Sequence, residues 1–192
     1  KKSIQGAIDV TAAGGVVHIA AGTYPDDFTI DGSTAQGITL SGAGATVTKV
    51  EEATVHVQNN DNVIIEDLTF EHGGPYDGAK IYPLLFDNAE GLLMRRCQVI
   101  NTAGGGGGDK RGVRIILNST TAVSIEDTLI TGGYFGVDAL GAIVTLRNLT
   151  VASAWEGGVK LQGPGTRTVS NSIFYDNGLH SSGSNQVAFA AG

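Results

Sequence analysis

One short pattern returns five times along this chain, in the copies VIIEDLTF, LLMRRCQV, VSIEDTLI, VTLRNLTV and RTVSNSIF. The copies align on one polar residue each, at separations of 29, 31, 21 and 23 residues; these ladder residues are Asp67, Arg96, Asp127, Asn148 and Asn171. A strand pattern that repeats at such a period is typical of a solenoid, because one coil cannot bury its apolar face without a neighbour. The copies are therefore expected to stack.

The alternation within each copy indicates how a coil is built. Residues four and two positions before the ladder residue are mostly apolar, and the residue three positions after it always is. Period-two alternation places such residues on one face, and a bend near the ladder residue lets two short strands enclose one interior. A second set of strands is expected at Thr54–Gln58, Gly112–Leu117, Gly136–Leu140, Gly158–Gln162 and Gln186–Ala190. The pattern predicts an all-β, single-domain parallel β-helix over residues 1–192, with roughly six to seven coils.

The N-terminal stretch carries a further pattern. A short helix expected around Ser3–Ala13 leads into Gly14–Ile19 and then Gly22–Tyr24. This stretch resembles the opening of the pectin-lyase-like right-handed β-helix superfamily, in which a capping helix leads into a GG-V-h-I-x-x-GTY strand and turn. The resemblance implies a right-handed coil, with a cap over about residues 1–24 and coils over about 25–192. It implies no single function, because the superfamily includes lyases, hydrolases, epimerases, phage tailspikes and non-catalytic surface proteins.

Composition limits the function classes. Glycine is abundant at 29 residues but proline is rare at 4, which argues against a disordered Pro/Gly chain. The net charge of −7 argues against general nucleic-acid binding. No apolar run approaches membrane-spanning length, so no membrane insertion is expected. The chain opens Lys-Lys-Ser without Met, so it is interpreted as a processed product or a module of a longer chain. The lone Cys97 is expected in the core rather than as a nucleophile.

Aromatic residues gather at one phase of the expected coil. Tyr134 and Trp155 each stand seven positions after a ladder residue. Flat aromatic faces beside hydrogen-bonding side chains suit stacking on sugar rings. The candidate substrate-binding residues of this phase are Tyr76, Tyr134, Phe135, Trp155, Glu156, Tyr175 and His180. The alternative is that these rings only cover the edge of the core.

The second set of strands carries a charged row. Its aligned valines, at positions 113, 137 and 159, are followed by Arg114, Asp138 and Lys160. Equivalent strands lie about 4.8 Å apart, so these side chains are expected to meet on the outward face. One interpretation is a groove for an acidic polysaccharide, with Arg114 or Lys160 as a base and Asp138 as its partner. The resemblance agrees, since β-helix polyuronate lyases use basic residues of this kind on a sheet face. The alternative is a salt-bridge ladder that only pairs strands.

No cofactor or metal site is predicted. The acidic pairs, such as Glu66–Asp67, lack calcium-loop spacing, and neighbouring residues of a strand point to opposite faces. Calcium binding between the acidic loops stays an open alternative, which no sequence motif supports. The charges of Arg96 and Asp67 are expected to reach solvent or to find a partner. The amide of Asn148 is expected to bond the backbone of its turn.

Two functions fit the sequence. The first is a non-catalytic module of an extracellular or cell-surface protein, which presents a rigid surface to polysaccharide or assembles end to end with other copies of itself. It is suggested by the lack of a complete catalytic set and by the strand-like ending QVAFAAG, which would leave a coil end open. The second is a polysaccharide lyase, hydrolase or epimerase that uses Arg114, Asp138 and Lys160, with Tyr134 and Trp155 holding sugar.

Overall fold

A computed structural model describes residues 3–25, 27–33, 36–46, 48–51, 54–73, 82–102, 111–116, 122–140, 143–163, 165–178 and 185–189. Within these ranges the chain forms a short helix, α1 (Ile4–Ile8), and three parallel sheets of seven strands each. Sheet A consists of β1 (Val16–Ile19), β4 (Thr39–Gly42), β7 (Ile64–Glu66), β10 (Leu92–Arg95), β13 (Ala122–Glu126), β16 (Ile143–Arg147) and β19 (Arg167–Ser170).

The other two sheets are built in the same way. Sheet B consists of β2 (Gly22–Tyr24), β5 (Thr48–Glu51), β8 (Thr69–His72), β11 (Gln98–Asn101), β14 (Leu129–Gly132), β17 (Thr150–Ala152) and β20 (Ile173–Tyr175). Sheet C consists of β3 (Phe28–Asp31), β6 (Val55–Gln58), β9 (Leu84–Asp87), β12 (Arg111–Ile116), β15 (Phe135–Leu140), β18 (Gly157–Gln162) and β21 (Asn185–Phe189).

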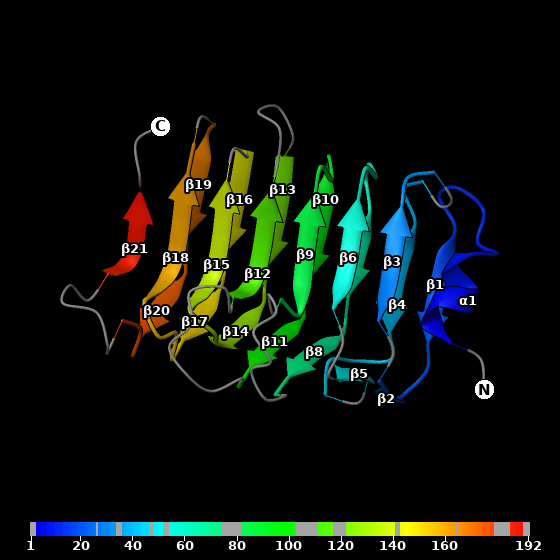
Figure 1. Cartoon of the computed structure of the whole chain (residues 1–192), viewed down its shortest axis with the longest axis horizontal. Coiled ribbons are helices and arrows are strands. Elements are labelled where there is room, and N and C mark those ends of the chain that lie inside the picture. Colours follow the sequence, from blue (N-terminus) through cyan, green and yellow to red (C-terminus); the bar gives the residue numbers. More distant parts are fainter. Residues whose placement is uncertain are drawn as a thin grey trace.

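The chain visits sheets A, B and C in turn, and each strand pairs in parallel with its equivalent in the next coil. Figure 1 shows the stack from α1 at one end to β21 at the other, with sheet C running along the front. The expected all-β parallel solenoid is therefore confirmed. The alignment of the second strand set is confirmed too, because Val113 pairs with Val137, Val137 with Val159 and Val159 with Val187.

The ladder residues lie at the turn from sheet A to sheet B, and all of them have left-handed backbone. Their φ angles are 60° at Asp67, 52° at Arg96, 47° at Asp127, 55° at Asn148 and 49° at Asn171. Asn and Asp tolerate this conformation better than other residues with a Cβ, which explains why they recur at this position. Arg96 occupies it without that advantage.

The interior is filled by stacked rows of apolar side chains. Two positions before the ladder residues, Ile65, Met94, Ile125 and Leu146 are all fully buried, as the alternation predicts. Cys97 lies in the same core at 2% exposure, and burial raises the pKa of its thiol to about 12. A thiol with so high a pKa forms little thiolate, so the expected core role is supported over a nucleophilic one.

Helix α1 covers the N-terminal end of the stack. Ile4 and Ile8 are buried against the first coil, and Ser3 Oγ accepts a hydrogen bond from Gly6 N at 3.0 Å as N-cap. The Gln5 side chain pairs with the backbone of Thr29 in β3, donating to its O at 3.2 Å and accepting from its N at 2.8 Å. This amide therefore replaces a neighbouring strand at the edge of sheet C. The helix ends at Ile8, earlier than the expected Ala13. Within the described ranges, no helix has the length and apolar character that a membrane crossing requires.

Candidate functional site

Sheet C carries the predicted charged row. The backbone of Arg114 pairs with Asp138, and Asp138 pairs with Lys160, so the three positions are neighbours in adjacent coils. The side chain of Arg114 lies outside the described part of the structure. Asp138 is only 4% exposed, whereas Lys160 is half-buried. The alternation did not predict that burial, so the row is not an open groove at Asp138.

Phe135, which lies on the same strand as Asp138 and is only 7% exposed, contacts Lys160. The ammonium Nζ of Lys160 lies 4.9 Å from the centroid of the Phe135 ring. The neighbouring Tyr134 ring meets Phe135 edge-to-face, with centroids 5.1 Å apart and an interplanar angle of 82°. The predicted aromatic and charged groups thus meet in one place, where the cation lies against an aromatic ring.

Glycine at position 136 makes this arrangement possible. A Cβ on Gly136 would lie 2.4 Å from Val151 Cγ1 and 2.7 Å from Gly158 O. Gly136 therefore faces the interior, where only a residue without a side chain fits, and the preceding Phe135 is directed outward toward Lys160. Because Val137 is also buried in the core, strict alternation is lost at this point of β15.

The turn from sheet B to sheet C brings the next coil beside these residues. Trp155 N donates to Gly133 O and Glu156 N donates to Tyr134 O, each at 2.8 Å. Trp155 is 37% exposed and Glu156 is half-buried. We call Tyr134, Phe135, Trp155, Glu156 and Lys160 the corner cluster. Its residues come from two adjacent coils, where they lie in the turns between sheets B and C and in the strands β15 and β18 that follow these turns.

The remaining predicted aromatic positions lie elsewhere. Tyr175, 54% exposed, belongs to β20 and pairs with Ala152 on sheet B. It is therefore in the last coil of the stack, on the sheet that precedes the corner. Tyr76 and His180 lie outside the described residues.

Sequence reasoning missed His56, which stands in the same outward row as Arg114. Val55 pairs with Leu84 and Leu84 with Val113, so His56 follows Val55 as Arg114 follows Val113. Burial lowers the pKa of His56, against the opposing effect of the Asp87 and Asp31 carboxylates. Its Nε2 is buried without a hydrogen-bond partner among the residues described. Aligning Val55 with Val113 would have found it.

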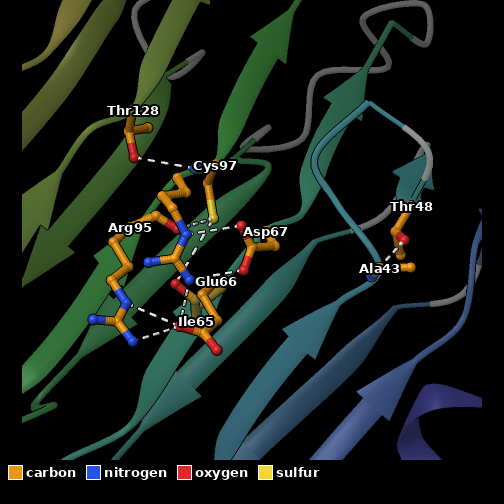
Figure 2. Close-up of polar contacts among 9 residues, drawn as sticks. Ala43, Thr48, Ile65, Glu66, Asp67, Arg95, Cys97 and Thr128 are labelled. Atoms are coloured by element: carbon orange, nitrogen blue, oxygen red, sulfur yellow. Dashed lines mark hydrogen bonds and ion pairs between the residues drawn. The ribbon is translucent and has the colours of Figure 1, made fainter.

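A second group of charges lies at the end of sheet A. It includes the ladder residues Asp67 and Arg96, whose partners Glu66 and Arg95 were not predicted. Arg95 Nη2 lies 2.7 Å from Glu66 Oε2, and Arg96 Nη2 lies 2.9 Å from the same oxygen and 2.8 Å from Asp67 Oδ2. Figure 2 shows the carboxylates of Glu66 and Asp67 directed toward this one group of guanidinium side chains. The expectation that Glu66 and Asp67 point to opposite faces is wrong, because the chain turns at Asp67 with its positive φ.

The electrostatic effects of this group are consistent with its contacts. Burial alone would raise the pKa of Glu66, but the hydrogen bonds from Arg95 and Arg96 outweigh it and lower that pKa. The hydrogen bond from Arg96 likewise lowers the pKa of Asp67 and raises that of Arg96 itself. Asp67 and Arg96 therefore pair with each other. This is one of the two outcomes expected from the sequence.

The same pattern continues in the next coils. Arg147 Nη2 lies 2.6 Å from Glu126 Oε2, and Asn148 Nδ2 donates to Asp127 Oδ1 at 2.8 Å. The Asn148 amide was expected to bond the backbone of its own turn. It instead donates to the Asp127 carboxylate in the preceding coil. We call the set made of Glu66, Asp67, Arg95, Arg96, Glu126, Asp127, Arg147 and Asn148 the charge row.

Among the residues that the structure describes, no group of three or more His, Cys, Asp or Glu side chains is placed to hold a metal ion. No protein-family model, no curated protein and no solved structure matches the chain. The assignment of the fold therefore depends on the three stacked parallel sheets of the structure.

Proposed function

We propose that this chain is a non-catalytic, polysaccharide-binding module of the pectin-lyase-like β-helix type, exposed outside the cell or on its surface, and that the corner cluster is its binding site. One observation carries the proposal: the Lys160 ammonium lies over the Phe135 ring, with Tyr134 beside it and the exposed Trp155 one coil further on. Phe135 itself is only 7% exposed, so the accessible groups are the Lys160 cation on β18 and the Trp155 ring in the turn that precedes this strand.

These side chains suit an acidic polysaccharide in particular. The C–H face of a sugar ring packs against an exposed aromatic side chain such as Trp155. The Lys160 ammonium supplies donors for a sugar carboxylate, and hydrogen bonds between charged groups are the stronger ones. Glu156 supplies an acceptor for sugar hydroxyls. Because the chain as a whole is acidic at −7, binding of a polyanion requires this local arrangement rather than a general attraction.

The position of Lys160 suits the binding of an anion. Its Nζ lies 4.9 Å from the centroid of the Phe135 ring, and this contact holds the ammonium group in place. An ammonium group held in this way can donate hydrogen bonds to a sugar carboxylate.

The register of sheet C favours a second candidate, a lyase, hydrolase or epimerase that acts through Arg114, Asp138 and Lys160. In that case the buried Asp138 would orient the basic residues beside it. Affinity electrophoresis in acidic and neutral polysaccharides, with and without calcium, separates the two. Retarded protein with glycan of unchanged length supports binding, and shortened glycan supports the enzyme.

End-to-end self-assembly is less well supported than glycan binding. Helix α1 covers the first coil with Ile4 and Ile8, and Gln5 occupies the backbone groups of Thr29 that a further strand would use. Stacking another copy on this end would require α1 to leave. We therefore place the binding function on the side of the solenoid and not on this end.

A further inference from the structure

The charge row changes sign from coil to coil. Glu66, Arg95, Glu126 and Arg147 are successive partners across β7, β10, β13 and β16. Beside them the ladder residues repeat the order, from Asp67 through Arg96 to Asp127, and end in the neutral Asn148. Since adjacent strands are about 4.8 Å apart, the surface carries bands of negative, positive, negative and positive charge at that spacing.

These groups remain accessible although they are paired within the chain. Arg96 is 44% exposed and Arg147 51% exposed, with the carboxylates of Glu66 and Glu126 more deeply placed beneath them. In the described structure the ion pairs of both glutamates use Oε2. A carboxylate has about four acceptor positions, so each glutamate can accept a further donor through Oε1.

The next outward row of sheet A, beside the charge row, is uncharged. On the same outward face of sheet A, Ile64, Leu93, Ser124 and Thr145 form the neighbouring row and are partly buried. Ile64 and Leu93 add apolar area next to the charges. A molecule placed on the charge row would therefore meet no further charge on that row of sheet A.

A pattern of alternating sign is complementary to its own reverse. Two copies that face each other with antiparallel solenoid axes, about a two-fold axis between β10 and β13, place Glu66 of one copy opposite Arg147 of the other. Arg95 of one copy then faces Glu126 of the other, and Arg96 faces Asp127. A two-fold contact repeats each of these pairs, so all of the facing charges are opposite in sign or neutral.

Other arrangements bring like charges together. With parallel axes, Glu66 of one copy faces Asp67 of the other and Arg95 faces Arg96. With antiparallel axes shifted so that the two-fold passes through β10, Arg95 faces its own equivalent and Glu66 faces Glu126. The charges thus select the antiparallel orientation. Among its registers, the two-fold between β10 and β13 pairs the largest number of opposite charges.

We propose that the charge row is a docking surface for a second copy of this chain, which binds as an antiparallel two-fold dimer. The surface is narrow and largely polar, so the dimer is a weak and reversible one. Its formation depends on ionic strength, because exposed charges are screened within about 3 Å at 1 M salt. This surface lies apart from the corner cluster, and the inference does not depend on glycan binding.

Sedimentation of the full chain tests the dimer, at protein concentrations from about 10 μM to about 1 mM. At low salt we expect a reversible shift from monomer to dimer over this range, and at about 1 M salt only monomer. A monomer at low salt throughout the range would overturn the proposal.

A charge swap tests the orientation. Arg147→Glu places a carboxylate opposite Glu66, and Glu66→Lys places an ammonium opposite Arg147, so each variant alone should associate at least about tenfold more weakly. Mixed in equal amounts, they should form a heterodimer, because both facing pairs are then opposite in sign. Failure of the mixture to associate, when both variants keep the circular dichroism spectrum of the native chain, would contradict the proposed geometry.

Matched controls come from another ion-pair group. Lys49 on sheet B lies 3.0 Å from Glu51 and 2.7 Å from Glu71, outside the charge row. Lys49→Glu and Glu71→Lys change the net charge as the two test variants do, and both should still form the native dimer. Equal loss of association in these controls would show that net charge alone weakens the dimer, and it would overturn the proposed surface. If Glu66→Lys does not fold, Arg95→Glu with Glu126→Lys provides the second swap pair.

Discussion

The ammonium group of Lys160 lies 4.9 Å from the centroid of the Phe135 ring, across two adjacent coils of the solenoid. This contact joins Lys160, one of the three charged residues predicted to line up on sheet C, to Phe135, one of the predicted aromatic residues. It places a cation against an aromatic ring, in the coil whose preceding turn carries the exposed Trp155, and it is the basis of the proposed binding site.

Gly136 is predicted to be irreplaceable for the local structure of this site. Gly136→Ala brings a Cβ to 2.4 Å from Val151 Cγ1 and 2.7 Å from the backbone oxygen of Gly158. Neither neighbour is the free end of a flexible side chain, so the strand must shift. We expect the free energy of unfolding in urea to fall by about 1–3 kcal/mol, together with loss of glycan affinity as Phe135 moves. Native stability in this variant would contradict the inward position of Gly136.

Arg96 is predicted to carry backbone strain that an asparagine relieves. Its φ of 52° lies in the left-handed region, where Asn is tolerated and Ala is not. Arg96→Asn and Arg96→Ala both remove the ion pairs of Arg96 with Glu66 and Asp67. The difference between them reports the backbone together with the hydrogen bond that an Asn at this position can donate to Asp67, as Asn148 donates to Asp127. We expect the Asn variant to be more stable by about 1 kcal/mol in equilibrium denaturation. Equal stability of the two variants would show that the ladder position has no such preference.

His56 is predicted to make stability depend on pH near neutrality. Burial lowers the pKa of His56 below its ordinary value of 6.5, although Asp87 and Asp31 oppose this effect. The unfolded chain therefore binds the proton at higher pH than the folded chain, and stability falls as the pH drops through 6.5. The carboxylates of Asp31, Glu66 and Asp67 have lowered pKa values, so their contribution is lost only in more acidic solution.

Thermal denaturation between pH 7.5 and pH 5.5, a window set around the ordinary histidine pKa of about 6.5, measures this effect. The native chain should lose more stability over the window than His56→Gln, which has no imidazole to protonate. His18→Gln is the matched control, because His18 is exposed on β1. The opposite order, with His56→Gln losing more stability than the native chain, would mean that Asp31 and Asp87 outweigh burial.

Much of the fold could be predicted from the sequence because the repeat reports the coil directly. The ladder residues recur since their backbone must be left-handed, and Val113, Val137 and Val159 recur since each fills the same interior row. His56 was missed because β9, the strand that links its row to Arg114, lies between two insertions and has Leu84 in place of valine.

The side-chain geometry of the site was harder to predict for a physical reason. Alternation assigns a residue to a face only while the strand is regular, and it fails where Gly136 and Val137 both face inward. Phe135 is thereby turned outward, and the burial of Asp138 could not be expected. In the same way, Glu66 and Asp67 converge on Arg96 because the backbone turns between the two sheets.

The proposed binding site is best tested through the affinity of this chain for an acidic polysaccharide, measured by isothermal titration calorimetry in parallel with glycan length on a gel. We expect binding without shortening of the glycan. Trp155→Ala should weaken it about tenfold. Lys160→Met should weaken binding of the acidic glycan to a similar extent but leave a neutral one unaffected, and Lys49→Met should change neither. Unchanged affinity in both the Trp155 and Lys160 variants would contradict the corner cluster as the binding site, and cleavage of the glycan by the native chain would contradict a non-catalytic role.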